Sequence, residues 1–176
     1  MSSLGKKGAL ESIPPVSDRI DQLLDTLGDG SGTTEQAAAA AEYLYKAPPG
    51  TVAVFERLNV TLETASRIAP NEYGDITALT NGILITVKNA SGGIIHTFTP
   101  QPIKVTYHWS LLAGTDVSPS AFTAGVDSVS LRWTFSKGGA NVAINGDAGE
   151  YFSMDVRDTL AGLTSHLSHV QGYLAR

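Results

Sequence analysis

The sequence predicts an all-β protein, an antiparallel β-sandwich or jelly roll of about nine strands that follows an N-terminal arm. Short runs of alternating apolar and polar residues recur about every 8 to 12 residues, with turn-forming residues between them. The connections are too short to hold the crossover helices that a parallel sheet requires. A length of 176 residues is typical of about one domain.

Residues 1–33 differ in composition from the rest and predict the arm. Ser17 can cap a helix over residues 17–27, and Gly28 can end it. A glycine-rich linker, residues 28–32, joins the helix to a sandwich over residues 34–176. A helix this short needs an apolar surface, either on its own domain or on a neighbouring subunit. Its apolar stripe, at i, i+3, i+4 and i+7, consists of Ile20, Leu23, Leu24 and Leu27.

The next segment predicts a β-hairpin. Five alanines, residues 37–41, lead into its first strand, and the turn signal Pro-Pro-Gly at 48–50 ends that strand. A period-2 pattern then predicts the second strand, with one side formed by Val52, Val54, Leu58, Val60 and Leu62.

The remaining strands follow from the same alternation. In the clearest one, Leu131 and Trp133 face inward while Arg132 faces outward. Burial in the core is expected for Trp133 and also for Tyr107 and Trp109. The last strand loses its alternation around residues 169–170, which suggests a bulge. These strands cover residues 83–88, 94–98, 103–109, 129–136, 141–145, 151–156 and 163–174.

Composition and charge exclude several classes of protein. The chain has no cysteine, so it forms neither a disulfide framework nor a thiolate metal site. A net charge of -5 and a pI near 5.2 argue against binding to nucleic acid or to an anionic membrane. Neither a signal peptide nor an apolar run of membrane-spanning length is visible, so folding in a reducing cytoplasm is expected. Serine and threonine, 33 residues, outnumber the 29 charged ones, which suits a β-surface in an assembly.

No motif predicts an enzyme, a cofactor or a metal site. His166 and His169 would share one face of a helix, but a strand sends them to opposite faces. No spacing pairs His96 or His108 with a nucleophile and an acid. Acid pairs such as Asp155 and Asp158 are common at solvated strand ends. We therefore expect no catalytic residue.

One loop offers a candidate contact residue. Tyr73, in the loop 71–75, is the aromatic residue most expected to be exposed. The candidate partner-binding residues are therefore Ile20, Leu23, Leu24, Leu27 and Tyr73. Exposed aromatic residues on one face would instead favour a carbohydrate-binding module, which stays open as an alternative.

Several segments resemble small β-sandwich structural proteins of tailed-bacteriophage virions, including decoration and other head-associated proteins. The resemblance covers about residues 43–173 and leaves the arm unmatched. The similar segments include Tyr-Lys-Ala-Pro-Pro-Gly-Thr-Val at the start of 45–60, together with 73–83, 96–104, 131–135, 158–166 and 170–172.

This resemblance implies a non-enzymatic virion protein made in the host cytoplasm. A capsid decoration (cement) protein is the leading expectation, and a head-tail connector, collar or fibre-base protein is the alternative. The implied partners are the major capsid protein or other virion proteins, with no nucleic acid and no membrane. A symmetric homo-oligomer, such as a trimer, is also expected. An arm that orders on a partner and a symmetric array would each strengthen attachment.

Overall fold

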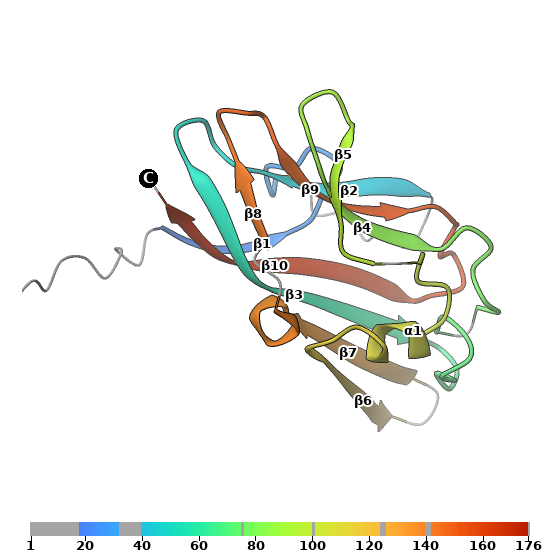
Figure 1. The fold of residues 1–176 in the computed structure, drawn as a ribbon. Helices are drawn as coiled ribbons and strands as arrows, with labels where there is room; N and C mark the ends of the chain where they lie inside the picture. The colour runs from blue at the N-terminus through green and yellow to red at the C-terminus, as the bar shows by residue number, and fades with distance from the viewer. Residues whose placement is uncertain are drawn as a thin grey trace, which may run out of the picture.

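Ten β-strands form two sheets that face each other (Figure 1). The computed structural model describes residues 18–31, 40–74, 76–99, 101–123, 126–139 and 142–175. Ser17, Gly32, alanines 37–39, Asp75, Pro100 and Asn141, which belong to predicted features, lie outside these ranges. The strands are β1 (Arg19–Leu23), β2 (Ala41–Lys46), β3 (Val52–Thr64), β4 (Ile83–Lys88), β5 (Ile94–Thr97), β6 (Thr115–Thr123), β7 (Val126–Thr134), β8 (Val142–Asn145), β9 (Tyr151–Val156) and β10 (Ser165–Ala175).

The predicted antiparallel β-sandwich is confirmed. The six-stranded sheet A has the order β1-β10-β3-β7-β6. The sixth strand, β8, pairs with the start of β3, residues 52–55, whereas β7 pairs with residues 57–64 of β3. The four-stranded sheet B has the order β2-β9-β4-β5. Every strand pairing is antiparallel.

Alternating side chains from the two sheets build the core. In β7, Val129, Leu131 and Trp133 are buried while Ser130 and Arg132 are exposed, as the alternation predicts. Aromatic rings meet across the interior: the centroid of Phe152 on β9 lies 5.3 Å from that of Phe55 on β3. Such tilted contacts between large rings stabilise the packing of the two sheets.

The helix predicted over residues 17–27 is wrong, because residues 19–23 form strand β1. This strand pairs with β10 from Arg19↔Tyr173 to Leu23↔His169. Ile20 and Leu24 stand four positions apart, a spacing that puts them on one face of a helix and equally on one face of a strand. The pairing with β10 selects the strand, so residues 18–31 are part of the folded body and not a tethered arm.

The hairpin predicted for residues 43–62 is also wrong. β2 pairs with β9 in sheet B, whereas β3 lies in sheet A. The turn at 48–50 therefore carries the chain from one sheet to the other. Pro48 and Pro49 have no N–H to donate to a strand ladder, and the Pro48 carbonyl closes the turn by accepting the N–H of Thr51 at 3.2 Å.

The strand predicted over residues 103–109 is replaced by an isolated bridge and a short helix. Ile103 bridges Ile83, and α1 (Tyr107–Ser110) follows. The N–H groups of Thr106 and Tyr107 are used by loop carbonyls at Glu72 and Pro70, so this backbone does not join a sheet. Trp109 is fully buried as expected, but Tyr107 is 54% exposed, contrary to its predicted place in the core.

The last strand contains the irregularity that its sequence predicts. Its register with β3 shifts between Gln171 and Gly172, just after the residues where the alternation fails. A Cβ atom on Gly172 would lie 2.0 Å from the carbonyl oxygen of Val54. Only glycine therefore fits this bulge.

Candidate protein-docking surface

The predicted partner-binding residues near the N-terminus do not form one exposed stripe. Ile20 and Leu24 are buried in the core, and Leu23 is half-buried on the edge strand β1. Leu27 is 59% exposed, in a turn held by Asp25, whose carboxylate accepts the N–H groups of Leu27 and Gly28. Of the four, only Leu27 keeps a fully exposed apolar side chain that a partner could contact.

Tyr73, predicted to be exposed, is fully buried. It forms an isolated bridge with Ile76, and one hydrogen bond of 3.0 Å joins its hydroxyl to Nε2 of His166 on β10. Burial lowers the pKa of His166 to about 3 and raises the pKa of Tyr73. Both side chains are therefore neutral near pH 7, and their contact is a buried structural one.

The four histidines are engaged in different parts of the fold. His166 is buried and His169 is half-buried, on opposite faces of β10 as predicted, with His169 Nδ1 4.0 Å from Asp21 Oδ1. The rings of His96 and Phe98 meet edge to face, with centroids 4.4 Å apart. His108 Nδ1 accepts the N–H of Lys104 at 3.2 Å.

The two acids noted in the sequence, Asp155 and Asp158, form hydrogen bonds with different partners. Asp155 accepts a hydrogen bond of 2.8 Å from Nε of Arg157, whereas Asp158 accepts the N–H groups of Asn81 and Gly82. Within the described ranges, no three histidine, aspartate or glutamate side chains come together as metal ligands. No helix in the described part of the chain is long and apolar enough to cross a membrane.

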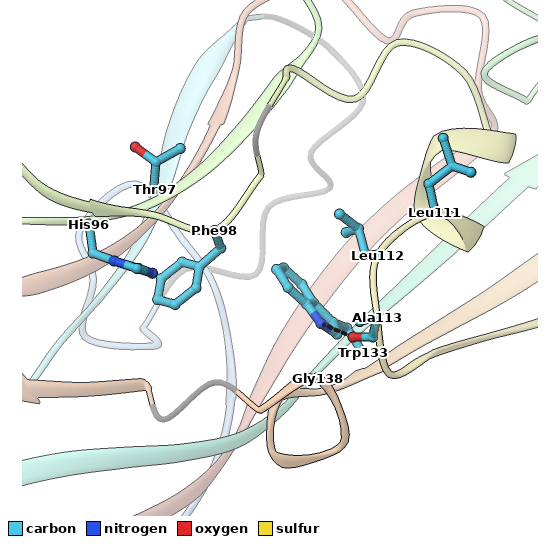
Figure 2. A pocket seen from close by; sticks show the side chains of 8 residues that line it. All are labelled: His96, Thr97, Phe98, Leu111, Leu112, Ala113, Trp133 and Gly138. Atoms are coloured by element: carbon cyan, nitrogen blue, oxygen red, sulfur yellow. Dashed lines mark hydrogen bonds between the residues drawn. The ribbon is translucent and has the colours of Figure 1, made fainter.

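A hollow of about 310 Å³ opens between β5 and the segment that follows α1 (Figure 2). His96 and Phe98 line one side, Leu111 and Leu112 line the other, and Trp133 of β7 lies between them. The indole Nε1 of Trp133 donates to the carbonyl oxygen of Ala113 at 3.1 Å, which fixes the ring. The hollow therefore has a rigid aromatic wall and apolar sides.

Two further hollows continue the first. One, of about 300 Å³, shares Leu111 and Leu112 with it. The other, of about 130 Å³, shares His96 and Phe98. We call these three hollows together the open-edge groove. The second hollow adds Gln101, Ile103 and His108, and the third adds Val87, Ile95, Val142, Ala143 and Glu150.

The open-edge groove has an almost uncharged lining and exposed apolar rims. Glu150 is the one carboxylate among the residues that line the three hollows. Oε2 of Glu150 accepts the N–H of Asn145 at 2.8 Å. Leu111 is 62% exposed, and Ile94 and Ile95 on β5 are 54% and 52% exposed. Exposed apolar groups gathered around a groove are typical of a protein-binding surface.

The two sides of the sandwich explain why the groove lies here. On one side, the turn after β1 ties the sheets together, because Leu44 of β2 donates its N–H to Asp25 at 2.7 Å. On the other side, α1 lies beside β6 of sheet A, and the segment after α1 faces β5 across the groove (Figure 1). The groove is the gap that this arrangement leaves.

Sequence analysis did not single out the groove residues, although two adjacent pairs carried a signal. Ile94-Ile95 begins a predicted strand, and Leu111-Leu112 lies in a predicted connection. Adjacent side chains of a strand point to opposite faces, so one isoleucine of the first pair must face away from the core. Comparison with family models, with curated proteins and with solved structures found no match.

Proposed function

We propose that this chain is a non-enzymatic structural protein that binds other proteins, and that it acts as a decoration (cement) protein on the capsid of a tailed bacteriophage. The observation that carries the protein-binding part is the almost uncharged open-edge groove, with the exposed side chains of Leu111, Ile95 and the neighbouring Ile94. The resemblance of residues 43–173 to virion proteins supports the proposal that the partner is a bacteriophage capsid. A head-tail connector, collar or fibre-base protein would use the same surface chemistry.

Carbohydrate binding receives less support from the geometry. A sugar-binding platform needs an exposed aromatic face. Trp133 is 5% exposed and its Nε1 is used by Ala113, while Trp109 is fully buried. The exposed rims of the groove are aliphatic side chains, which suit a protein partner better than a sugar ring.

Leu111→Asp should weaken the binding of the full chain to virion shells by about tenfold or more, because it puts a charge into two of the three hollows. Leu111 is exposed, so the fold should persist. Co-sedimentation of the purified protein with shells that lack it measures the effect. Electron microscopy of gold-labelled protein on intact particles then distinguishes shell, vertex and neck.

Leu27→Asp is the matched control, since Leu27 has the same side chain and nearly the same exposure but lies outside the groove. Unchanged binding by Leu111→Asp together with lost binding by Leu27→Asp would transfer the contact to the turn after β1. Wild-type protein that binds no part of the particle would contradict the virion function itself.

A further inference from the structure

Strand β5 is an unprotected sheet edge. It is the outer strand of sheet B, and its four residues, Ile94–Thr97, are all exposed. It contains no aspartate, glutamate, lysine, arginine or proline. Natural proteins usually guard such an edge with charge, proline or a covering segment, because its unpaired backbone groups can pair with another strand.

Three of the other outer strands, β1, β2 and β6, carry such guards. β1 contains Arg19 and Asp21, and the side chain of Asp21 is 69% exposed. β2 contains Glu42 and is bridged to the turn after β1. β6 contains Asp116 and also Pro119, which has no N–H to donate. The short strand β8 is uncharged like β5, and the two line the same hollow.

The regular part of β5 directs backbone groups toward its open side. His96 pairs with Val87, and the N–H of Phe98 donates to the carbonyl oxygen of Ile85 at 3.0 Å. Successive residues of an antiparallel strand direct their N–H and C=O groups to opposite edges. The N–H and C=O of Thr97, which lies between these two residues, therefore point away from β4.

We propose that the partner seated on this edge is a second copy of the chain, with β5 of one protomer paired antiparallel to β5 of the other across a two-fold axis. The proposal rests on the proposed function in using the open-edge groove as the protein-binding surface, and it names the first partner there. The two sheets B would join into one continuous sheet. Each copy would cover the side of the other's groove that β5 forms, and the side formed by Leu111 and Leu112 would remain open to the shell.

Charge and apolar surface both favour a second copy. A two-fold interface puts each residue near its own symmetry mate, so it requires a self-complementary surface. An edge such as β1 would bring Asp21 close to Asp21, whereas β5 has no aspartate, glutamate, lysine or arginine to meet its own symmetry mate. The half-exposed side chains of Ile94 and Ile95 supply apolar surface to both sides.

The bulge in β5 limits how much of the strand can pair. The register with β4 shifts between Val87 and Lys88, so the regular pairing is confined to the end near His96 and Thr97. A short strand pairing is weak on its own. Burial of the exposed side chains of Ile94 and Ile95 would supply the remaining stabilisation.

Ile95→Lys should convert a dimer into a monomer, with a dissociation constant at least about tenfold higher, because it puts two like charges beside the two-fold axis. Sedimentation equilibrium of the full chain over a range of concentrations measures the mass. Leu27→Lys adds the same charge at an equally exposed leucine outside the groove and should remain dimeric. Circular dichroism of both variants checks that the fold is intact.

Single cysteines test the geometry directly, because the chain has none of its own. Each of the four positions 94–97 is replaced in turn by cysteine and oxidised with glutathione disulfide. The position closest to the two-fold axis should form a disulfide-linked dimer, since a disulfide needs Cβ atoms within about 4.5 Å. Leu27→Cys serves as the control and should stay monomeric on a non-reducing gel.

The outcomes separate this inference from the proposed function. A wild-type chain that is monomeric at all concentrations but binds shells would overturn the second copy and leave the proposed function standing. A wild-type dimer that Ile95→Lys dissociates, but that binds no part of the particle, would support the second copy and overturn the proposed function. Protection of the β5 amides from hydrogen exchange only on the particle would assign the edge to a different protein and also overturn the second copy.

Discussion

Acidification from about pH 7.5 to about pH 5 should lower the free energy of unfolding by about 2 kcal/mol through His166 alone. The His166 side chain is fully buried and hydrogen-bonded to Tyr73, and burial lowers the pKa of His166 to about 3. In the unfolded chain a histidine has a pKa near 6.5. Protons therefore bind the unfolded state preferentially. This stabilisation is complete above about pH 6.5 and is lost at about 1.4 kcal/mol per pH unit as the pH falls toward 3.

Urea titrations at the two pH values measure this effect, with His166→Gln as the test variant. Glutamine does not titrate, so the variant should lose most of the pH dependence even if it is less stable overall. His169→Gln changes the same residue type on the exposed face of the same strand, and the pH dependence due to His166 should persist there. An unchanged pH dependence in His166→Gln would show that His166 is not the source.

Leu24→Ala should cost about 3 kcal/mol of unfolding free energy, because it removes a fully buried side chain and leaves a cavity. Leu27→Ala, three residues away, should change stability by less than about 0.5 kcal/mol, because its side chain is 59% exposed. Thermal or urea unfolding of the two variants measures the difference.

This pair also distinguishes the strand from the helix that the sequence suggested. On a helix with one apolar stripe, Leu24 and Leu27 would lie three positions apart on the same face and respond alike. In the structure, Leu24 follows β1 into the core and donates its N–H to Ser168 of β10 at 2.9 Å, whereas Leu27 faces outward. Equal losses from the two variants would contradict this arrangement.

The fold class could be predicted because most strands expose one face and bury the other. In β7, alternation alone identified the buried Leu131 and Trp133. Such a pattern is local, so a sequence shows it directly. The bulge near Gly172 was visible for the same reason, as a break in the alternation.

Other elements depended on contacts that a sequence does not show. The segment 107–110 alternates like a strand, yet the hydrogen bonds of Thr106 and Tyr107 to the loop at 70–72 turn it into a helix. β6 was missed because it contains Pro119, which an outer strand tolerates where a central one would not.

The candidate surface was the least predictable part. Tyr73 was expected to be exposed because it lies in a polar loop. Its hydroxyl instead shares a hydrogen bond with His166, which is 93 residues away in the sequence. The open-edge groove gathers β5, the segment after α1 and β7, which only the tertiary fold brings together. Exposure depends on such long-range packing, whereas periodicity does not.

The place of β10 in sheet A has a consequence for biosynthesis. Among the described residues, β1 is the first strand and β10 the last. β1 pairs there only with β10, which separates it from β3. During synthesis on a ribosome, the backbone groups of β1 and of one edge of β3 therefore have no strand to pair with until residues 165–175 have emerged. Sheet A can close only after residues 165–175 have left the ribosome, so a chain stalled before Ser165 would expose the apolar faces of both strands to chaperones or to aggregation.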